Sequence, residues 1–124
     1  MILLAAALAA TLLAAPANPA EMKALTAEDL VRLKRMSDPQ VSPDGRYVAY
    51  VVRETDVEAN RGRTDVWLLD LTDKSAAPRR LTQNDANDSS PRWDPDSRTL
   101  YFLSTRSGLS QVWRLTLAGG ATLA

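Results

Sequence analysis

The chain has 124 residues, of which 45% are hydrophobic and 24% are charged, within the range of globular domains. Its 15 basic and 15 acidic side chains cancel, and no Lys or Arg run exceeds two residues, which argues against nucleic-acid binding. It contains no cysteine and no histidine, which excludes a thiolate nucleophile and a Ser-His-Asp triad formed within these residues. We therefore expect no cofactor site, no metal site and no catalytic residue in this chain.

Residues 1–20 carry no charged side chain, and residues 2–15 are apolar except for Thr11. This apolar stretch is shorter than the ~20 residues that a helix needs to cross a bilayer. An A-x-A cleavage pattern follows at residues 15–17. The pattern predicts a signal peptide over residues 1–20, an exported protein that is periplasmic or secreted, and no stable membrane span. The segment departs from a full signal in having no Lys or Arg after Met1, and an uncleaved anchor is the alternative.

Residues 21–38 read as an N-terminal helix and linker. Thr26 is a favourable N-cap, and Glu28 and Asp29 would lie in the first turn, where the helix dipole favours acidic side chains. The S-D-P sequence at residues 37–39 predicts the end of a helix of two to three turns. The apolar side chains of this helix would form one narrow stripe: Leu30, Leu33 and Met36.

A repeat begins at residues 39–52 (PQVSPDGRYVAYVV), which recur fifty-two positions later as residues 91–104 (PRWDPDSRTLYFLS). A second block, residues 65–71 (DVWLLDL), recurs forty-six positions later as residues 111–117 (QVWRLTL). Each pair of blocks shares four identical positions, which indicates a duplication. The alternative is two unrelated hairpins with common turn chemistry.

Each unit has the chemistry of antiparallel strands. The S-P-D-G-R sequence at residues 42–46 is a turn, and residues 47–52 and 66–71 are short runs rich in β-branched, aromatic and aliphatic residues. Residues 79–82 (RRLT) read as a short outer strand. The sequence therefore predicts a mainly β fold: the first two four-stranded blades of a β-propeller, at residues 39–82 and 83–124, the second incomplete, preceded by the signal peptide and the short capped helix.

The order of capped helix, SDPQVSPDGRYVAYVV, DVWLLDL, RRLT and a second P-x-W-x-P-D-x-R unit resembles the start of prolyl-oligopeptidase-family serine peptidases. It is most similar to the acylaminoacyl-peptidase and bacterial dipeptidyl-peptidase branches, over roughly residues 25–117. The resemblance implies a propeller followed by an α/β-hydrolase domain that carries the catalytic serine, aspartate and histidine. No G-x-S-x-G motif occurs in these residues.

We therefore expect an N-terminal fragment of an exported serine peptidase. Its propeller would control peptide access to the hydrolase domain, which is absent from this chain, and the chain alone would be inactive. The P-D-G-R turn and the V-W and L-T blocks also resemble the periplasmic propeller of the Tol system, so a non-catalytic propeller that binds partner proteins is the alternative. A third possibility is a two-blade unit that assembles with copies of itself.

The six extra residues of the first copy all fall in residues 53–64 (RETDVEANRGRT), which we expect to be a charged, irregular loop. Such loops carry function disproportionately often. In an intact peptidase this loop could face the substrate cavity, although many charged loops are only solvated. The candidate substrate-facing residues are Arg53, Glu54, Asp56, Glu58 and Arg61.

Other repeated residues have simpler explanations. Asp44 and Asp96 are expected to cap their own turns, and Asp85 and Asp88 lack the spacing of a calcium loop. Trp67 and Trp113 are expected to pack between blades, with an aromatic surface for peptide as the alternative.

Overall fold

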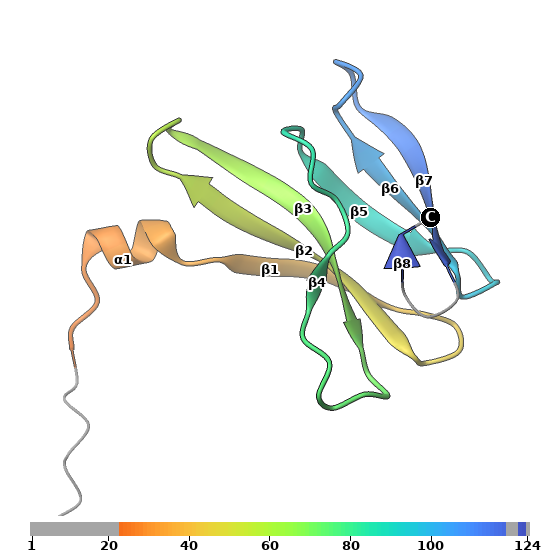
Figure 1. The fold of residues 1–124 in the computed structure, drawn as a ribbon. Helices are drawn as coiled ribbons and strands as arrows, with labels where there is room; N and C mark the ends of the chain where they lie inside the picture. The colour runs from red at the N-terminus through yellow and green to blue at the C-terminus, as the bar shows by residue number, and fades with distance from the viewer. Residues whose placement is uncertain (1–22, 119–121, 124) are drawn as a thin grey trace, which may run out of the picture.

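The computed structural model describes residues 23–118 and 122–123, so the predicted signal peptide, residues 1–20, lies outside the described residues. One helix and two antiparallel sheets make up this part of the chain (Figure 1). The helix is α1 (Ala27–Arg32). Sheet 1 has the strand order β1 (Arg35–Val41), β2 (Tyr47–Asp56), β3 (Arg61–Asp70) and β4 (Arg79–Arg80). Sheet 2 has the order β5 (Asp88–Trp93), β6 (Thr99–Ser104), β7 (Gln111–Ala118) and β8 (Thr122–Leu123).

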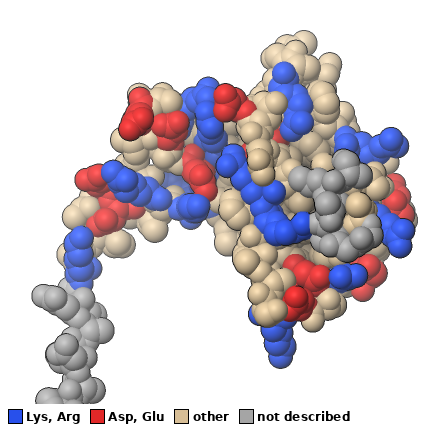
Figure 2. All heavy atoms as spheres, in the orientation of Figure 1, with Lys and Arg blue, Asp and Glu red and all other residues tan. Residues whose placement is uncertain are grey.

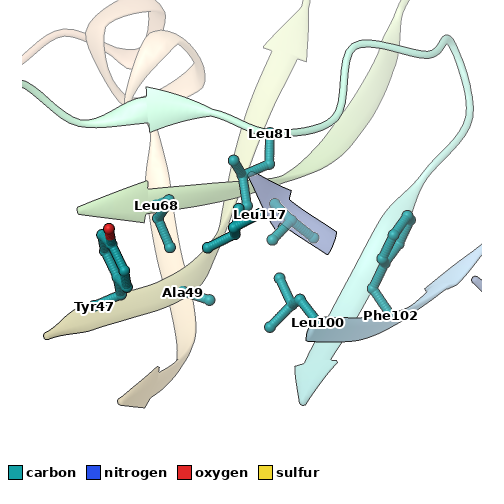
Figure 3. Close-up of a cluster of buried hydrophobic side chains, with 8 residues drawn as sticks. Tyr47, Ala49, Leu68, Leu81, Leu100, Phe102 and Leu117 are labelled. Atoms are coloured by element: carbon teal, nitrogen blue, oxygen red, sulfur yellow. The ribbon is translucent and has the colours of Figure 1, made fainter. Parts of the chain in front are cut away.

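The hydrophobic core lies between the two sheets (Figure 3). Both sheets contribute buried side chains to it, because the facing strands expose aliphatic and aromatic residues at every second position. Burying each large aliphatic side chain contributes ~1.5–3 kcal/mol, so the interface is the main source of stability. The cluster consists of Tyr47, Ala49, Val66, Leu68, Leu81, Leu100, Phe102 and Leu117.

Each sheet has one face that carries its repeated tryptophan, which we call the tryptophan face. In sheet 1, Tyr50 lies opposite Trp67, and in sheet 2 Phe102 lies opposite Trp113. Trp113 packs against the core cluster, so the tryptophan face of sheet 2 is turned toward sheet 1. Ala49 and the rest of the sheet 1 core residues lie on the opposite side of their sheet from Trp67. Packing between the sheets is thus confirmed for Trp113, whereas Trp67 points away from sheet 2.

The helix begins as predicted and ends earlier. Thr26 is the N-cap of α1: its Oγ1 accepts a hydrogen bond from the Asp29 backbone, and the Asp29 carboxylate accepts one from the Thr26 backbone. The prediction that the helix continues to residues 37–39 is wrong, because α1 has six residues and β1 begins at Arg35. Pairing of β1 with β2 satisfies the backbone hydrogen-bonding groups of this segment. A longer helix would have offered only one narrow apolar stripe for packing, which is too little to stabilise it.

Helix α1 stands beside the first strands and buries none of its own side chains (Figure 1). Its apolar side chains Leu30, Val31 and the following Leu33 remain half exposed. No helix within the described residues is long and apolar enough to cross a bilayer.

Candidate functional site at the β2–β3 hairpin

The extra residues of the first repeat form a regular hairpin. The prediction of an irregular loop over residues 53–64 is wrong, because β2 and β3 continue their ladder from Arg53 opposite Thr64 to Asp56 opposite Arg61. Only residues 57–60 form the turn. The Asp56 carboxylate accepts a hydrogen bond from the Ala59 backbone at 2.9 Å, and Asn60 takes a left-handed φ of 47°. Both residue types favour tight turns, and this signal in the sequence could have located the turn.

Three of the five predicted site residues line one groove. Glu54, Asp56 and Glu58 surround an open groove of about 460 Å³ between the hairpin and the end of α1, together with Arg32 and Lys34. The structure thereby brings acidic side chains of the hairpin next to basic side chains that precede β1. Figure 2 shows these charges alternating over α1 and the hairpin.

Arg53 and Arg61, the other two predicted residues, are exposed and do not line this groove. The guanidinium group of Arg53 lies across Gly62, where an added Cβ would come within 2.5 Å of Nη2. Glycine thus leaves room for the arginine on this face of the hairpin.

Ion pairs account for part of the charge in the groove. Lys34 Nζ lies 2.6 Å from Glu54 Oε1, and Arg32 Nη2 lies 2.7 Å from Glu28 Oε1. Glu58 is exposed and pairs with none of the described cations. The groove therefore offers a free carboxylate next to paired ones, which suits ligands with a positive charge or several hydrogen-bond donors.

A buried carboxylate in β3 lies beneath the hairpin. Asp65 is buried, and its Oδ2 lies 2.5 Å from Arg80 Nη2, while Thr82 Oγ1 donates to Oδ1 at 3.3 Å. Burial raises the pKa of Asp65, and the bond from Arg80 opposes this increase. The pair ties β3 to its neighbour β4 within sheet 1. Sequence reasoning missed it because fifteen positions separate the partners.

Sheet 2 has a buried carboxylate of its own. Asp88 is fully buried, and its Oδ2 accepts a hydrogen bond from Arg106 Nη2 at 3.0 Å. The Arg106 guanidinium carbon also lies 5.3 Å from the ring centre of Phe102 and 4.8 Å from that of Trp113. One arginine of the β6–β7 loop thus holds β5 and both aromatic side chains.

Asp85 and Asp88, which lack the spacing of a calcium loop, form ion pairs with different arginines. Asp85 pairs with Arg63 at 2.9 Å, and Asp88 pairs with Arg106. Among the described residues, no group of three or more His, Cys, Asp or Glu side chains could hold a metal ion.

The repeated turn residues cap their own backbones, as predicted. Asp44 Oδ1 accepts hydrogen bonds from Ser42 Oγ and the Arg46 backbone, and Asp96 Oδ1 accepts from the backbones of Arg98 and Thr99. The hydrogen bond from Ser42 lowers the pKa of Asp44, and the bond from the Arg98 backbone lowers that of Asp96. Both carboxylates are therefore committed to turn structure.

Comparison with known proteins identifies a matching family and several similar peptidases. A family model described as "TolB beta propeller domain" matches residues 34–123, which contain the described strands of both sheets. The peptidase YuxL of Bacillus subtilis, itself uncharacterized, is 32% identical over 99 residues, covering 79% of this chain and 15% of YuxL. Dipeptidyl-peptidase 5 of Porphyromonas gingivalis is 28% identical over 88 residues, covering 71% of this chain and 13% of that protein.

A solved structure shares both the sheet arrangement and part of the sequence. The isopeptidase AtxE2 superposes with a TM-score of 0.59 and 26% identity, over 80% of this chain and 20% of that protein. AtxE2 is a lasso peptide isopeptidase of Asticcacaulis excentricus, and a variant of it has been solved with Astexin3-dC4 bound. The present chain thus spans a fifth or less of each of these three proteins.

Proposed function

The chain belongs to the TolB beta propeller domain family, and from this premise we propose that it is the propeller portion of an exported serine peptidase. In this proposal, the propeller restricts which peptides reach a hydrolase domain supplied by residues outside these 124. The chain contributes substrate contacts and access control, and the serine, aspartate and histidine that cleave the peptide lie in the hydrolase domain.

The similarity to named peptidases is the observation that carries the proposal. YuxL, Dipeptidyl-peptidase 5 and AtxE2 are peptidases by name, and each aligns with most of this chain. The order in which a capped helix leads directly into the first strand adds support, because the resemblance to prolyl-oligopeptidase-family peptidases rests on this order of segments. Fold alone would not support an activity, since propellers serve many functions.

The β2–β3 hairpin is the element of this chain that we propose to contact peptides. It extends sheet 1 beyond the length of the second hairpin, and its charges are exposed. A peptide amino terminus or basic side chain could pair with Glu58, while Arg53 and Arg61 could meet a peptide carboxylate. These contacts would select peptides before they reach the hydrolase domain.

Export is part of the proposal and rests on residues 1–20. Their uncharged apolar run and A-x-A sequence support cleavage after Ala17 or Ala20. Amino-terminal sequencing of the protein recovered from outside the cytoplasm tests this step. A first residue between positions 18 and 21 is expected, and an intact Met1 would contradict it.

The reading frame beyond residue 124 provides the main test. We expect a G-x-S-x-G motif followed by an aspartate and then a histidine. The full product should react with a fluorophosphonate probe and release amino acids or dipeptides from peptide substrates. A frame that ends after further strands, with no such motif and no reaction with the probe, would overturn the proposal.

A matched pair of variants tests the role of the hairpin. In the active full-length product, Glu58→Lys is expected to raise the KM for peptides with a free amino terminus several-fold and to leave kcat nearly unchanged. Lys74→Glu, an exposed charge reversal in the connection at the opposite end of sheet 1, is the control. Equal effects of the two variants would remove the hairpin from the proposed contact surface.

A non-catalytic propeller that binds partner proteins is the second candidate. The description of the matching family, "TolB beta propeller domain", favours it, because that description names a propeller and no peptidase. A frame that closes the propeller and then ends would support this candidate. Capture of a defined partner by the purified propeller would then be its direct test.

A further inference from the structure

The groove between α1 and the β2–β3 hairpin lies beyond the part of sheet 1 that packs against a neighbouring sheet. The β6–β7 ladder of sheet 2 ends at Ser104 opposite Gln111, whereas the β2–β3 ladder continues for four more facing pairs, from Arg53 to Asp56. Glu54 and Asp56, which line the groove, belong to this continuation. A neighbouring sheet of the length of sheet 2 would therefore end before the groove, and further blades of that length would leave it open.

The groove also lies at the end of sheet 1 where the chain enters and leaves the sheet. β1 runs from this end toward the turn at residues 42–46, β2 returns, and β3 and β4 repeat the two directions. Each four-stranded unit of this kind returns the chain to the end at which it entered, whatever the number of units. Helix α1 and the β2–β3 hairpin share this end (Figure 1). In the proposed peptidase, the hydrolase domain would therefore begin on the side of the propeller where the groove opens.

The charges that line the groove leave an excess of carboxylates. Both basic side chains of the groove are held in the ion pairs described above. Asp56 and Glu58 form none of the ion pairs found among the described residues, and neither does Arg61, which lies opposite Asp56 in the ladder. The groove therefore favours a ligand group with a positive charge.

One ammonium group already occupies the groove, and it belongs to the chain itself. Lys34 Nζ lies 2.6 Å from Glu54 Oε1, and the two side chains are 63% and 39% exposed. An exposed ion pair contributes little net free energy, because water solvates the separated charges nearly as well. A second ammonium group can therefore replace Lys34 at Glu54 at little cost. The contact shows which ligand chemistry the hairpin carboxylates accept.

The groove also offers an apolar surface beside its carboxylates. Val57 lines it and is 53% exposed, and the groove has a volume of about 460 Å³. A lysine side chain can lay its methylene stem along such a surface while its ammonium group pairs with a carboxylate. A peptide amino terminus has no comparable stem. The combination of Val57 and the free carboxylates thus fits a lysine side chain better than an amino terminus.

We propose that the groove between α1 and the β2–β3 hairpin binds a lysine side chain of the peptide substrate, in competition with Lys34. The incoming ammonium group pairs with Glu58, and with Glu54 once Lys34 has turned away. The contact would retain lysine-containing peptides on the side of the propeller where the hydrolase domain begins. The inference rests on the proposed peptidase function, which supplies the peptide.

A binding comparison on the full-length product tests the inference. The product is first treated with the fluorophosphonate probe, so that an active peptidase leaves the peptides intact. Two acetylated pentapeptides that carry a fluorophore at the carboxyl end differ only in a central lysine or norleucine. Fluorescence anisotropy should show that the lysine peptide binds about two- to five-fold more tightly, the range expected for exposed ion pairs.

Variants of the two partners of one ion pair should act in opposite directions. Lys34→Gln frees Glu54 and should tighten binding of the lysine peptide about two- to five-fold, whereas Glu54→Gln releases a competing positive charge and should weaken it. Glu58→Gln should weaken it by a similar factor. Lys74→Gln removes an exposed lysine at the opposite end of sheet 1 and should change nothing. The norleucine peptide should respond to none of these variants.

Three results would overturn the inference. The first is equal affinity for the two acetylated peptides, and the second is a change in the same direction for Lys34→Gln and Glu54→Gln, as expected of an ion pair that only supports the fold. The third is a norleucine peptide with a free amino terminus that responds to Glu58→Gln as strongly as the lysine peptide, which would assign the groove to amino termini. Failure of the peptidase function is seen separately, as absence of reaction with the fluorophosphonate probe, and the binding comparison can still be made.

Discussion

Sheets 1 and 2 share their turns, their Val-Trp strands and their strand order, and they differ at one end. The β2–β3 hairpin extends through four additional facing pairs, from Arg53 opposite Thr64 to Asp56 opposite Arg61, whereas the β6–β7 ladder ends at Ser104 opposite Gln111. The side chains of the core cluster lie outside this extension. The shared part of the repeat therefore carries the stability, and the part that differs is free to carry recognition.

The two sheets also use different buried ion pairs at this end. In sheet 1, Arg80 holds Asp65 of β3, and in sheet 2, Arg106 of the β6–β7 loop holds Asp88 of β5. The arginines come from different parts of the repeat, so these pairs are not copies of one another. The comparison predicts that substitutions in the core lower the stability of both sheets alike. Substitutions at the hairpin end should affect only the sheet that carries them.

Loss of a core leucine from either sheet should have the largest effect. Leu68 and Leu100 are fully buried on opposite sides of the interface. Leu68→Ala and Leu100→Ala should each lower the free energy of unfolding by about 2–5 kcal/mol, because a cavity remains. Urea unfolding followed by tryptophan fluorescence measures the change. The two sheets would instead fold as separate units if the two variants lost unequal amounts of unfolding free energy and one of them unfolded part of the chain before the rest.

Val112→Ala is the control for those core variants. Val112 has a similar aliphatic side chain on the outer face of sheet 2, where it is 68% exposed. Replacement of Val112 by alanine should change the free energy of unfolding of the described two-sheet structure by less than about 0.5 kcal/mol.

Removal of the buried carboxylates should have the next largest effect. Asp88→Ala leaves the Arg106 guanidinium without its partner between two aromatic rings, and we expect a loss of about 2–3 kcal/mol. Asp65→Ala should cost less, about 1–2 kcal/mol, because the Arg80 side chain is 32% exposed and water can replace part of the bond. Thermal unfolding monitored by circular dichroism ranks the two variants. The reverse order would indicate that Arg80 is the more strongly held arginine.

A shorter β2–β3 hairpin should leave the fold almost unchanged. Deleting two facing pairs, Glu54 with Arg63 and Thr55 with Gly62, keeps the turn and the alternation of the strands. The deletion removes two exposed ion pairs, so the free energy of unfolding should fall by less than about 1 kcal/mol. Urea unfolding measures this change, and a loss comparable to that of Leu68→Ala would contradict the division between a stable repeat and a recognition extension.

Local sequence signals were sufficient to predict the capped start of the helix, the two repeated turns and most of the strands. Thr26 with Asp29, and Asp44 with Arg46, act over three residues or fewer, so their chemistry is readable from neighbouring positions. The family was also evident from the order of these segments. Both errors came from strand pairing: residues 35–37, 53–56 and 61–64 lie in strands because they have facing partners.

The long-range contacts of the candidate site could not be read in this way. Asp65 meets Arg80 because β3 pairs with β4, and Asp88 meets Arg106 because β5 pairs with β6, so both contacts depend on strand pairing within a sheet. Polar residues that look solvated in sequence thus prove to be buried. Trp67 lies on the face of sheet 1 that points away from sheet 2, and the sequence alone does not show which face of sheet 1 packs against sheet 2.

The turn between the first two strands of each sheet offers the finest test of the comparison, because among the described residues this turn carries an ion pair in sheet 1 and none in sheet 2. Arg46 Nη2 lies 3.2 Å from Asp70 Oδ2, whereas Arg98 has Thr116 at the corresponding position of its repeat. Hydrogen bonds from Thr72, followed by the bond from Arg46, lower the pKa of Asp70 from 3.8 to about 2. Because the ionised form is favoured in the folded state, the stabilisation is present above about pH 4 and is lost as the pH falls toward about 2. Thr72→Val should move the pKa of Asp70 back toward 3.8, measured by an NMR titration of the carboxyl carbon, while Arg98→Gln in sheet 2 should leave it unchanged. A shift caused by Arg98→Gln would show that the two turn ends are electrostatically coupled across the interface.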